Sequence, residues 1–561
     1  MRKLILLFSA LVLCIGVVFG QGKTVSGRVI DENNEPAIGA SIQVKGAETV
    51  GTISDFDGNF TITLPAGTTH LIVSYVGYTT VEQVAKDGMV VRLSADAEVL
   101  DEVMVVAYGT STKKAFAGSA TVVKGETLEK KNPSEVSKAL AGEIAGVQVV
   151  SSTGQPGTTA TIRVRGIGSI NADATPLYVV DGIPYDGDIA AIDPADIAST
   201  TVLKDATATS LYGSRGANGV ILITTKKGTS GESGKIDIDV KYGGNMRFIP
   251  MYKSIKSPEE YIKYAWLSLY NQARINGRTD EQASKIASNN LYSSAGLPAA
   301  YNIWSVPGNT LVDAFGNVQV TAADRLPGYE NISNEWEDAL FRNGQKVEAT
   351  LRISGGSEKT TYYTSFGYLK DQGYYIGSDY NRFQARVNVD HQAKKWLKGN
   401  MNMQYSYSIV NNPGQEGGGA MNNGFKYINE IPAIYPVLLH NADGSIVYDN
   451  DNEPVYDYGD MTGRLYGAAI NPAGTLRFDK QRTRQHQFVG NGMLEATICK
   501  GLKLTTNFGI QYVGADASQL ANSLYGDAAG VGRIYKTTQH AYQFTWNQIL
   551  SYAGDFGNGH N

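Results

Sequence analysis

The sequence predicts a mostly β protein whose long C-terminal part supplies strands of a transmembrane β-barrel. After residue 234, eight segments alternate apolar and polar residues with a period of two, as strands with one buried face do. Their connections alternate between short and long, the pattern of a barrel with short turns on one side of a membrane and long loops on the other. No stretch after the N-terminus is apolar enough for a spanning helix, which leaves a closed barrel as the way across a membrane.

The first 20 residues have the pattern of a secretory signal peptide. Met1–Lys3 is positively charged, Leu4–Phe19 is apolar, and the small residue Gly20 ends the segment. The apolar run is shorter than the ~20 residues of a membrane-spanning helix, which favours cleavage over anchoring. After cleavage Cys499 is the one cysteine left, so we expect neither an internal disulfide nor a cysteine-based metal site. The formal net charge of −5 argues against a nucleic-acid partner.

Residues 24–96 predict a small β-sandwich, because short β-branched runs alternate with turns at regular spacing. Within them Asp55–Asn59 reads DFDGN and invites a calcium-binding interpretation. The run lacks the rest of an EF-hand loop, including its closing Glu. A type I′ Asp-Gly hairpin turn accounts for it without a metal, and we expect that turn.

Residues 99–112 join an acidic lead-in, a β-branched run and a Gly/Ser/Thr exit between two compact segments. An extended apolar peptide on a flexible tether can add a strand to the edge of a partner's sheet, where backbone hydrogen bonds supply the affinity. The alternative is an ordinary strand of a neighbouring domain. Taken alone, the segment favours the ordinary strand.

Residues 113–230 predict a small mixed α/β domain. Two glycine-punctuated blocks, Ile162–Gly187 and Val202–Gly228, alternate short β-branched runs with Gly, Asn and Pro, which indicates short strands and tight turns. A helix start at Asn132–Glu135 is followed by apolar residues at helical spacing as far as Gly146. Neither block contains a nucleophile–base pair or a metal-ligand cluster.

The same two blocks resemble, nearly word for word, the plug domain of TonB-dependent outer-membrane transporters of the SusC/RagA-like family of Bacteroidota. The resemblance implies that residues 24–96 are the carboxypeptidase-regulatory-like (prealbumin-like) domain that precedes such plugs, placed in the periplasm. It also reverses the preference at residues 99–112. The TonB box would then consist of Asp101, Glu102, Val103, Met104, Val105, Val106 and Ala107.

Two further sets of residues take candidate roles from this resemblance. Plug arginines in such transporters pair with carboxylates of the barrel wall, and Arg163, Arg165 and Arg215 are the candidates here, with solvated surface arginines as the alternative. The aromatic residues of the long loops could stack on sugar rings or serve only in packing. These are Tyr301, Trp304, Tyr456 and Tyr458.

Residues 235–561 predict the N-terminal part of the barrel. An eight-stranded barrel has room only for its own side chains, whereas plugged transporters close with about 22 strands, so we expect the barrel to be incomplete in a fragment or a truncated gene product. A helix start at Ser257–Glu260, in the first long loop, indicates either loop packing or a surface lid. The strands are expected at residues 235–248, 346–355, 360–370, 380–391, 395–410, 483–499, 501–514 and 541–553.

The function expected from the resemblance is TonB-dependent import across the outer membrane, with no enzymatic activity, metal or cofactor. The implied partners are TonB with its inner-membrane energising complex, a SusD-like surface lipoprotein, outer-membrane lipid, and a ligand that is most often a glycan oligosaccharide. The alternatives are a peptide importer of the same family and a non-transporting adhesin or signalling receptor.

Overall fold

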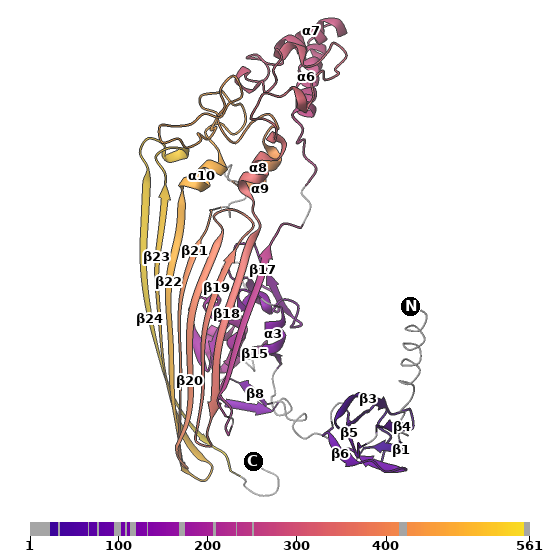
Figure 1. Cartoon of the computed structure of the whole chain (residues 1–561). Helices are drawn as coiled ribbons and strands as arrows, with labels where there is room; N and C mark the ends of the chain where they lie inside the picture. Colours follow the sequence, from indigo (N-terminus) through magenta and orange to yellow (C-terminus); the bar gives the residue numbers. More distant parts are fainter. Residues whose placement is uncertain are drawn as a thin grey trace, which may run out of the picture. The chain divides into compact units, whose positions relative to one another are not determined.

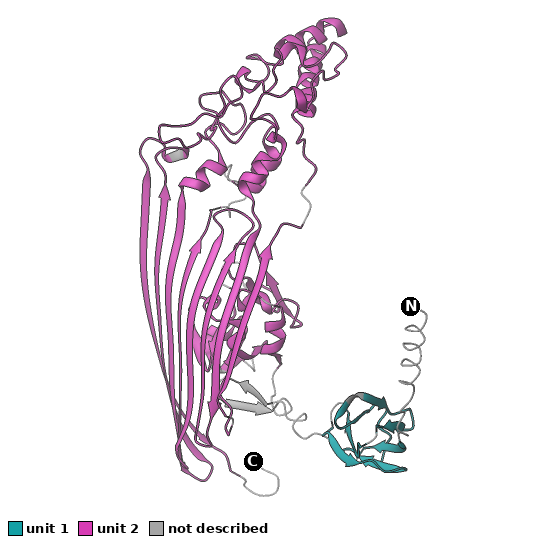
Figure 2. Cartoon of the chain, viewed as in Figure 1, with its two compact units in different colours: residues 1–117 teal, residues 118–561 magenta. Residues whose placement is uncertain are grey.

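The structure, a computed structural model, divides into two compact units, residues 1–117 and 118–561 (Figure 2). The predicted signal peptide lies outside the described residues. These are residues 23–554 without 32–33, 66, 76–77, 95–102, 107–108, 113–118, 132, 168–173, 206–208, 232, 249–251 and 415–422.

The first unit contains the predicted β-sandwich, which the structure confirms. Seven short strands form two sheets, and alternate residues of each strand fill the space between them, with Val25, Ile42 and Leu71 fully buried. One sheet has the order β4 (Asn59–Leu64), β1 (Lys23–Ile30), β7 (Met89–Arg92); the other has the order β3 (Ala47–Ile53), β2 (Ser41–Val44), β5 (His70–Ser74), β6 (Val81–Val84).

The Asp55–Asn59 segment is a turn, but its predicted type was wrong. The Gly58 amide donates to the Asp55 carbonyl at 2.9 Å, and of the two central residues expected to have positive φ only Gly58 does, at 78°. This geometry is a type I turn closed by a glycine bulge. The Asp55 carboxylate accepts the amides of Asp57 and Asn59 at 3.0 and 2.8 Å, so its oxygen satisfies the turn rather than an ion.

The second unit begins with the predicted mixed α/β domain, which we call the plug. A five-stranded sheet and a two-stranded sheet enclose a core that includes Leu128, Ile162, Ile197 and Val202. The larger sheet has the order β10 (Ala120–Lys124), β15 (Ile197–Leu203), β16 (Val220–Thr225), β13 (Leu177–Val180), β14 (Ile183–Tyr185); β11 (Val147–Val150) pairs with β12 (Thr161–Val164). Short helical segments are α3 (Gly125–Lys130), α4 (Val136–Ala139), η1 (Ile189–Ala191), η2 (Pro194–Asp196) and η3 (Ser210–Gly216).

The helix predicted after Asn132–Glu135 is only one turn long, as α4. Glu135, rather than Asn132, is its N-cap, and its carboxylate accepts the amides of Ser137 and Lys138 at 2.7 and 3.0 Å. Gly142 then adopts a φ of 77°, which ends helical geometry. The apolar residues at helical spacing are nevertheless all buried, so the pattern located the core and overestimated the helix.

The remaining strands form one eight-stranded antiparallel sheet, which we call the wall (Figure 1). Each strand pairs with the next in chain order, all eight predicted strands are present, and most are longer than predicted. Long connections lie at one end of the sheet and short turns at the other, as the loop lengths predict. The strands are β17 (Lys235–Asn245), β18 (Gly344–Gly356), β19 (Thr360–Gln372), β20 (Asp379–Lys394), β21 (Leu397–Asn411), β22 (Lys480–Cys499), β23 (Leu502–Ala521) and β24 (Arg533–Tyr552).

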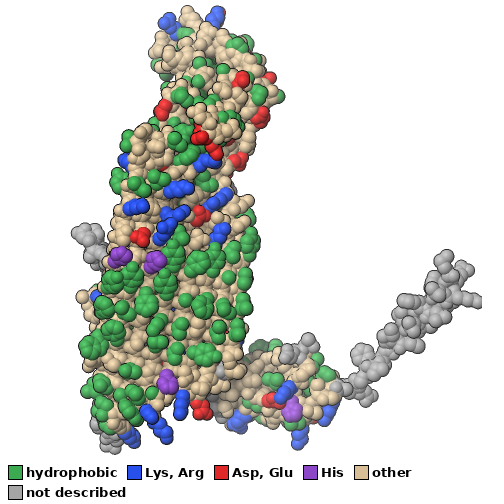
Figure 3. Space-filling view, turned by 60° about the vertical axis from the view of Figure 1, so that its left-hand side comes forward, with side chains coloured by type: hydrophobic (Ala, Val, Ile, Leu, Met, Phe, Trp, Pro, Cys, Tyr) green, Lys and Arg blue, Asp and Glu red, His purple; other side chains and the backbone are tan. Residues whose placement is uncertain are grey.

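The two faces of the wall have opposite chemistry. On β20, Phe383 is 50% exposed on the outer face, whereas its neighbour Arg382 is 2% exposed on the face that covers the plug. Figure 3 shows hydrophobic side chains gathered in a broad band over the outer face, with Lys and Arg at both ends of the band. An apolar outer face and a polar inner face are typical of strands that separate lipid from a lumen. Among the described residues, no helix combines the length and apolarity needed to cross a membrane.

The two long connections of the wall fold together around one core, which we call the loop domain. Residues 246–343 and 412–479 both contribute to it, and its centre is aromatic, with Trp266, Trp336 and Tyr435 buried. The predicted helix start at Ser257 is confirmed, because its hydroxyl accepts the Glu260 amide at 3.2 Å. The helices are α6 (Pro258–Ile275), α7 (Asp280–Asn290), α8 (Ile332–Leu340), α9 (Gly424–Glu430) and α10 (Pro472–Phe478), with single turns η4 (Ala299–Tyr301), η5 (Gly308–Thr310) and η6 (Ala322–Asp324); η7 (Gly526–Ala528) lies in the next loop, between β23 and β24.

Candidate functional site: the plug against the wall

Three aspartates of the plug are buried against the wall. Asp193 is the N-cap of η2 and accepts the Ala195 amide at 2.9 Å, and Asp196 ends the same turn. Asp181 follows β13 with a φ of 48° and accepts the Thr225 amide and hydroxyl at 2.9 and 2.8 Å. Because a buried charge is costly unless it is paired and hydrogen-bonded, these carboxylates require partners.

The partners are polar side chains that point inward from β19 and β20. Tyr363 and Ser365 donate to the two oxygens of Asp196 at 2.8 and 2.9 Å. Arg386 lies 3.5 Å from both Asp196 and Asp181, which makes it the shared counter-ion of two plug carboxylates. This charge-assisted network ties η2 and the end of β13 to the middle of the wall.

Arg382 forms a second anchor one turn of the pleat away. Its guanidinium lies 3.5 Å from the Asp193 carboxylate and donates to the backbone carbonyls of Ala190 and Ile192 at 2.7 and 3.4 Å. Gln384, between the two arginines on the same face, donates to Asp193 at 2.6 Å. The η1–η2 segment of the plug is therefore held by side chains that alternate along a single strand.

Further contacts spread this attachment over the sheet. Arg352 of β18 pairs with Glu129 of α3 at 3.1 Å. On the opposite side, Tyr185 donates to Gln487 of β22 at 2.8 Å. Gly157 faces Tyr380 so closely that a Cβ added there would lie 2.4 Å from the ring, which explains a glycine at this contact.

The plug–wall ion pairs run in the opposite charge sense from the prediction, because the wall carries the arginines and the plug carries the carboxylates. Arg215 pairs with Asp186 within the plug. Arg163 lies on β12 with a buried guanidinium nitrogen that lacks a hydrogen-bond partner among the described residues, and Arg165 is an exposed turn residue with a φ of 57°. The signal missed in the sequence is the alternation of Arg382, Gln384, Arg386 and Asn388 with the apolar residues of β20.

The predicted TonB box lies partly within the described residues. Val103–Val106 forms β8, which pairs antiparallel with β9 (Gly109–Thr112), while Asp101, Glu102 and Ala107 lie outside them. Within the described chain β8 pairs with β9 alone, so its other edge retains backbone donors and acceptors. A strand with a free edge has the geometry that strand addition needs.

The aromatic residues predicted as stacking candidates belong to the interior of the loop domain. Tyr301, Trp304 and Tyr458 are buried and Tyr456 is half-buried, so packing, the alternative interpretation, accounts for them. The Tyr301 hydroxyl donates to the Asp457 carboxylate at 2.8 Å. Burial and the Asp457 charge raise the pKa of this hydroxyl, which keeps it protonated as a donor.

The loop domain also contains a strained carboxylate. Burial raises the pKa of Glu335 on α8 to about 7, although the backbone amides of Val437 and Leu438 oppose the shift. A raised pKa in the folded state means that ionisation costs stability as the pH rises through 7. We expect Glu335→Gln to stabilise the loop domain at pH 8 and to leave it unchanged near pH 4.

Hydrogen exchange of residues 332–340 and 435–440 at both pH values measures this effect. Glu337→Gln, a change on the same helix at a residue that pairs with Lys256 on the surface, is the matched control. Equal protection of the Glu335→Gln variant and the wild type at pH 8 would contradict the prediction.

The chemistry of the site is adhesion of one domain to another. The network consists of counter-ions and hydrogen bonds, and the described residues hold no group of three or more His, Cys, Asp and Glu side chains that could bind a metal ion. A polar interface of this kind joins two surfaces that can also be solvated separately. Such an interface suits a domain that must be held in place and later moved.

Comparisons with known proteins agree with this architecture. Residues 112–220 match the family described as the TonB-dependent Receptor Plug Domain, and residues 25–105 match the CarboxypepD_reg-like domain. A plug seated on the polar face of a partial barrel wall defines the chain as a TonB-dependent receptor. Its relatives place it more narrowly among the SusC/RagA-like receptors, which are receptors and transporters rather than enzymes.

The relatives are similar over nearly the whole of this chain. The TonB-dependent receptor SusC of Bacteroides thetaiotaomicron is 30% identical over 585 residues, covering 99% of this chain and 51% of that protein. A TonB-dependent receptor of Formosa agariphila is 30% identical over 546 residues, covering 96% and 48%. The chain thus spans about half the length of the curated relatives it matches.

Solved structures show the same fold. The RagAB peptide importer in its open-open state superposes with a TM-score of 0.62 at 24% identity, covering 82% of this chain and 47% of that one. The structure of the RagAB peptide transporter gives a TM-score of 0.59 at 25% identity, covering 79% and 46%.

Proposed function

We propose that this receptor imports a nutrient across the outer membrane by TonB-dependent transport. The observation that carries the proposal is the plug itself, which is fixed to the inner face of the wall by buried ion pairs and preceded by a strand with a free edge. In this proposal the signal peptide directs export, the sandwich domain lies in the periplasm, and the apolar outer face of the wall meets lipid. The TonB box is Asp101–Ala107.

The order of the plug strands gives the pulling force a place to act. The box leads, through residues 113–118, into β10, which is the end strand of the five-stranded sheet and pairs only with β15 in that sheet. The anchors to Arg382 and Arg386 lie instead on η1, η2 and the end of β13. Force on the box therefore loads an edge strand first, and the ladder of β10 can open before the anchored part leaves the wall.

A partner and a ligand class complete the proposal. The relatives of the SusC/RagA-like group indicate a SusD-like surface lipoprotein, and the loop domain is the part of this chain that stands beyond the strands to meet it. We propose a glycan oligosaccharide as the ligand. A peptide is the alternative, because the structural neighbour RagAB is named as a peptide importer.

Replacement of Val105 by proline tests the transport proposal. Proline removes a backbone donor from β8 and blocks strand addition, so ligand uptake by cells should fall to the level of a strain without the receptor. Val105→Ala keeps the backbone donor and should retain uptake. Growth on defined glycans and accumulation of labelled ligand measure the effect, and full uptake by the proline variant would exclude the TonB mechanism and leave an adhesin or a receptor without transport.

A further inference from the structure

Three adjoining cavities follow the rim of the plug on its loop-domain side. Two of them have volumes of about 360 Å³ and the one between them has about 100 Å³. The middle cavity shares Asn412 and Pro413 with the first, and Gly154, Gly373 and Tyr374 with the third. We call this continuous arc the plug-apex groove; the plug contributes its floor through residues 153–156.

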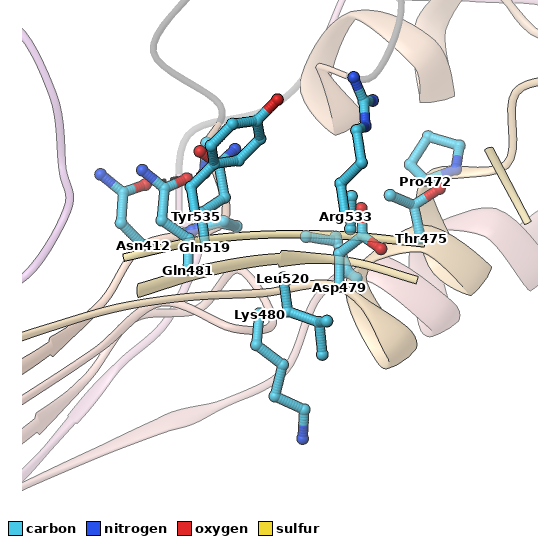
Figure 4. A pocket seen from close by; sticks show the side chains of 14 residues that line it. Asn412, Pro472, Thr475, Asp479, Lys480, Gln481, Gln519, Leu520, Arg533 and Tyr535 are labelled. Carbon is cyan, nitrogen blue, oxygen red and sulfur yellow. Dashed lines mark hydrogen bonds between the residues drawn. The ribbon is translucent and has the colours of Figure 1, made fainter. Parts of the chain in front are cut away.

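One end of the groove is lined by a row of side chains that crosses the wall. Gln481 of β22 lies opposite Gln519 of β23, and Gln519 lies opposite Tyr535 of β24. Asn412 continues the row, because its amide donates to the Gln481 carbonyl at 3.0 Å. Figure 4 shows these four side chains on one side of the strands, with Lys480 and Leu520 on the other.

The row offers neutral hydrogen-bonding groups. In the described part of the chain, the side chains of Gln481 and Gln519 form no hydrogen bond, and each amide has donors and an acceptor to offer. Tyr535, 59% exposed, presents a flat apolar face with a hydroxyl at its edge. The neighbouring carboxylate of Asp479 is already engaged by the Asn522 amide at 2.7 Å.

These groups match a hydroxyl-rich ligand. A sugar hydroxyl both donates and accepts, as a carboxamide does, and the C–H face of a sugar ring packs on an aromatic ring. An extended peptide binds most economically by adding to a free strand edge. The amides here lie on β22 and β23, whose backbones are paired on both sides, so recognition must come from side chains.

We propose that the plug-apex groove is a binding site for a neutral linear oligosaccharide, with Gln481, Gln519 and Tyr535 as specificity-determining residues. The proposal rests on the proposed import function for its ligand class and adds the residues that recognise the ligand. The groove also touches the plug, because Gln155 in its floor accepts from Ser378 at 2.6 Å and donates to the Asn411 carbonyl at 2.9 Å. A bound chain would therefore contact wall and plug together.

Binding by the detergent-solubilised full receptor tests the proposal. The probes are maltoheptaose, cellohexaose, xylohexaose, mannohexaose and a glycan array, with a casein peptide digest as the second ligand class. For the glycan that binds the wild type, we expect Gln519→Leu and Tyr535→Ala each to weaken the affinity about tenfold, and Tyr535→Phe to retain it. Gln548→Leu and Tyr542→Ala, on the outer face of β24, are the matched controls and should bind normally.

Each outcome has one meaning. Normal glycan binding by Gln519→Leu and Tyr535→Ala overturns the groove assignment, and binding of the peptides with no glycan bound overturns the ligand class. Val105→Pro should bind the glycan normally in this assay, since the box is not part of the groove. Loss of uptake in Val105→Pro with unchanged binding in the groove variants would sink the groove and leave the transport proposal standing, and the reverse pattern would do the opposite.

Discussion

Arg386→Met should loosen the plug within the wall by about 3–5 kcal/mol, which is the usual cost of leaving buried charges without their partner. The change removes the counter-ion that lies 3.5 Å from both Asp181 and Asp196. Both carboxylates would remain buried with only neutral donors. We expect the amides of β13, β16 and η2 to exchange with solvent faster, and we expect cells to become permeable to vancomycin, which an intact plug excludes.

Two variants separate lost charge balance from lost packing. Arg386→Met combined with Asp196→Asn removes one charge from each side, and should recover much of the stability because a neutral replacement of a buried pair is often tolerated. Arg484→Met, at an exposed position of β22, should leave exchange and permeability at the wild-type level. Slow exchange and low permeability in Arg386→Met itself would show that the ion pairs do not hold the plug.

The strands and the plug were predictable because their signals are local. Period-two alternation on β20, for example Phe383 and Val387 between polar residues, requires only that one face be apolar. Strand ends were less predictable. β23 extends to Ala521, well past the predicted end at residue 514, because polar residues such as Asp516 and Ser518 still pair with β24 where the barrel rises above the apolar band.

Contacts between distant segments were not predictable from one sequence. The alternation on β20 shows that Arg382 and Arg386 point away from the apolar face, but it does not show that Asp193 and Asp196 of the plug meet them. The stacking prediction failed for the same reason. Tyr301 carries no local mark of burial, and its burial depends on Asp457, which lies 156 positions along the chain.

The same property explains why the loop domain is an independent folding problem. Its two parts, residues 246–343 and 412–479, have no common period, and each holds apolar residues that it cannot bury alone. A buried ion pair lies at their junction. Arg464 and Asp457 belong to the second part, and Tyr301 of the first part donates to Asp457. Stability of the junction should therefore depend on a single arginine.

Arg464→Met should destabilise the loop domain by about 3–5 kcal/mol and expose it to proteases on intact cells. The Arg464 side chain is fully buried, and its guanidinium lies 3.8 Å from the Asp457 carboxylate. It also donates to the backbone carbonyls of Asp457 at 3.1 Å and of Gly467 and Ile470. Methionine fills part of the volume but leaves these acceptors without a donor, and an unsatisfied buried acceptor is costly.

Trypsin digestion of cells that display the receptor measures this effect, with cleavage at Lys426 as the readout. Arg477→Met is the matched control, because that arginine is half-exposed and pairs with Glu453 on the surface at 2.9 Å. A surface pair of this kind contributes little, so the control should resist trypsin as the wild type does. Since the plug-apex groove takes Pro472 and Thr475 from the same segment, Arg464→Met should also weaken glycan binding, whereas Arg477→Met should not. Equal resistance of Arg464→Met and Arg477→Met would show that aromatic packing, rather than the buried arginine, holds the two parts together.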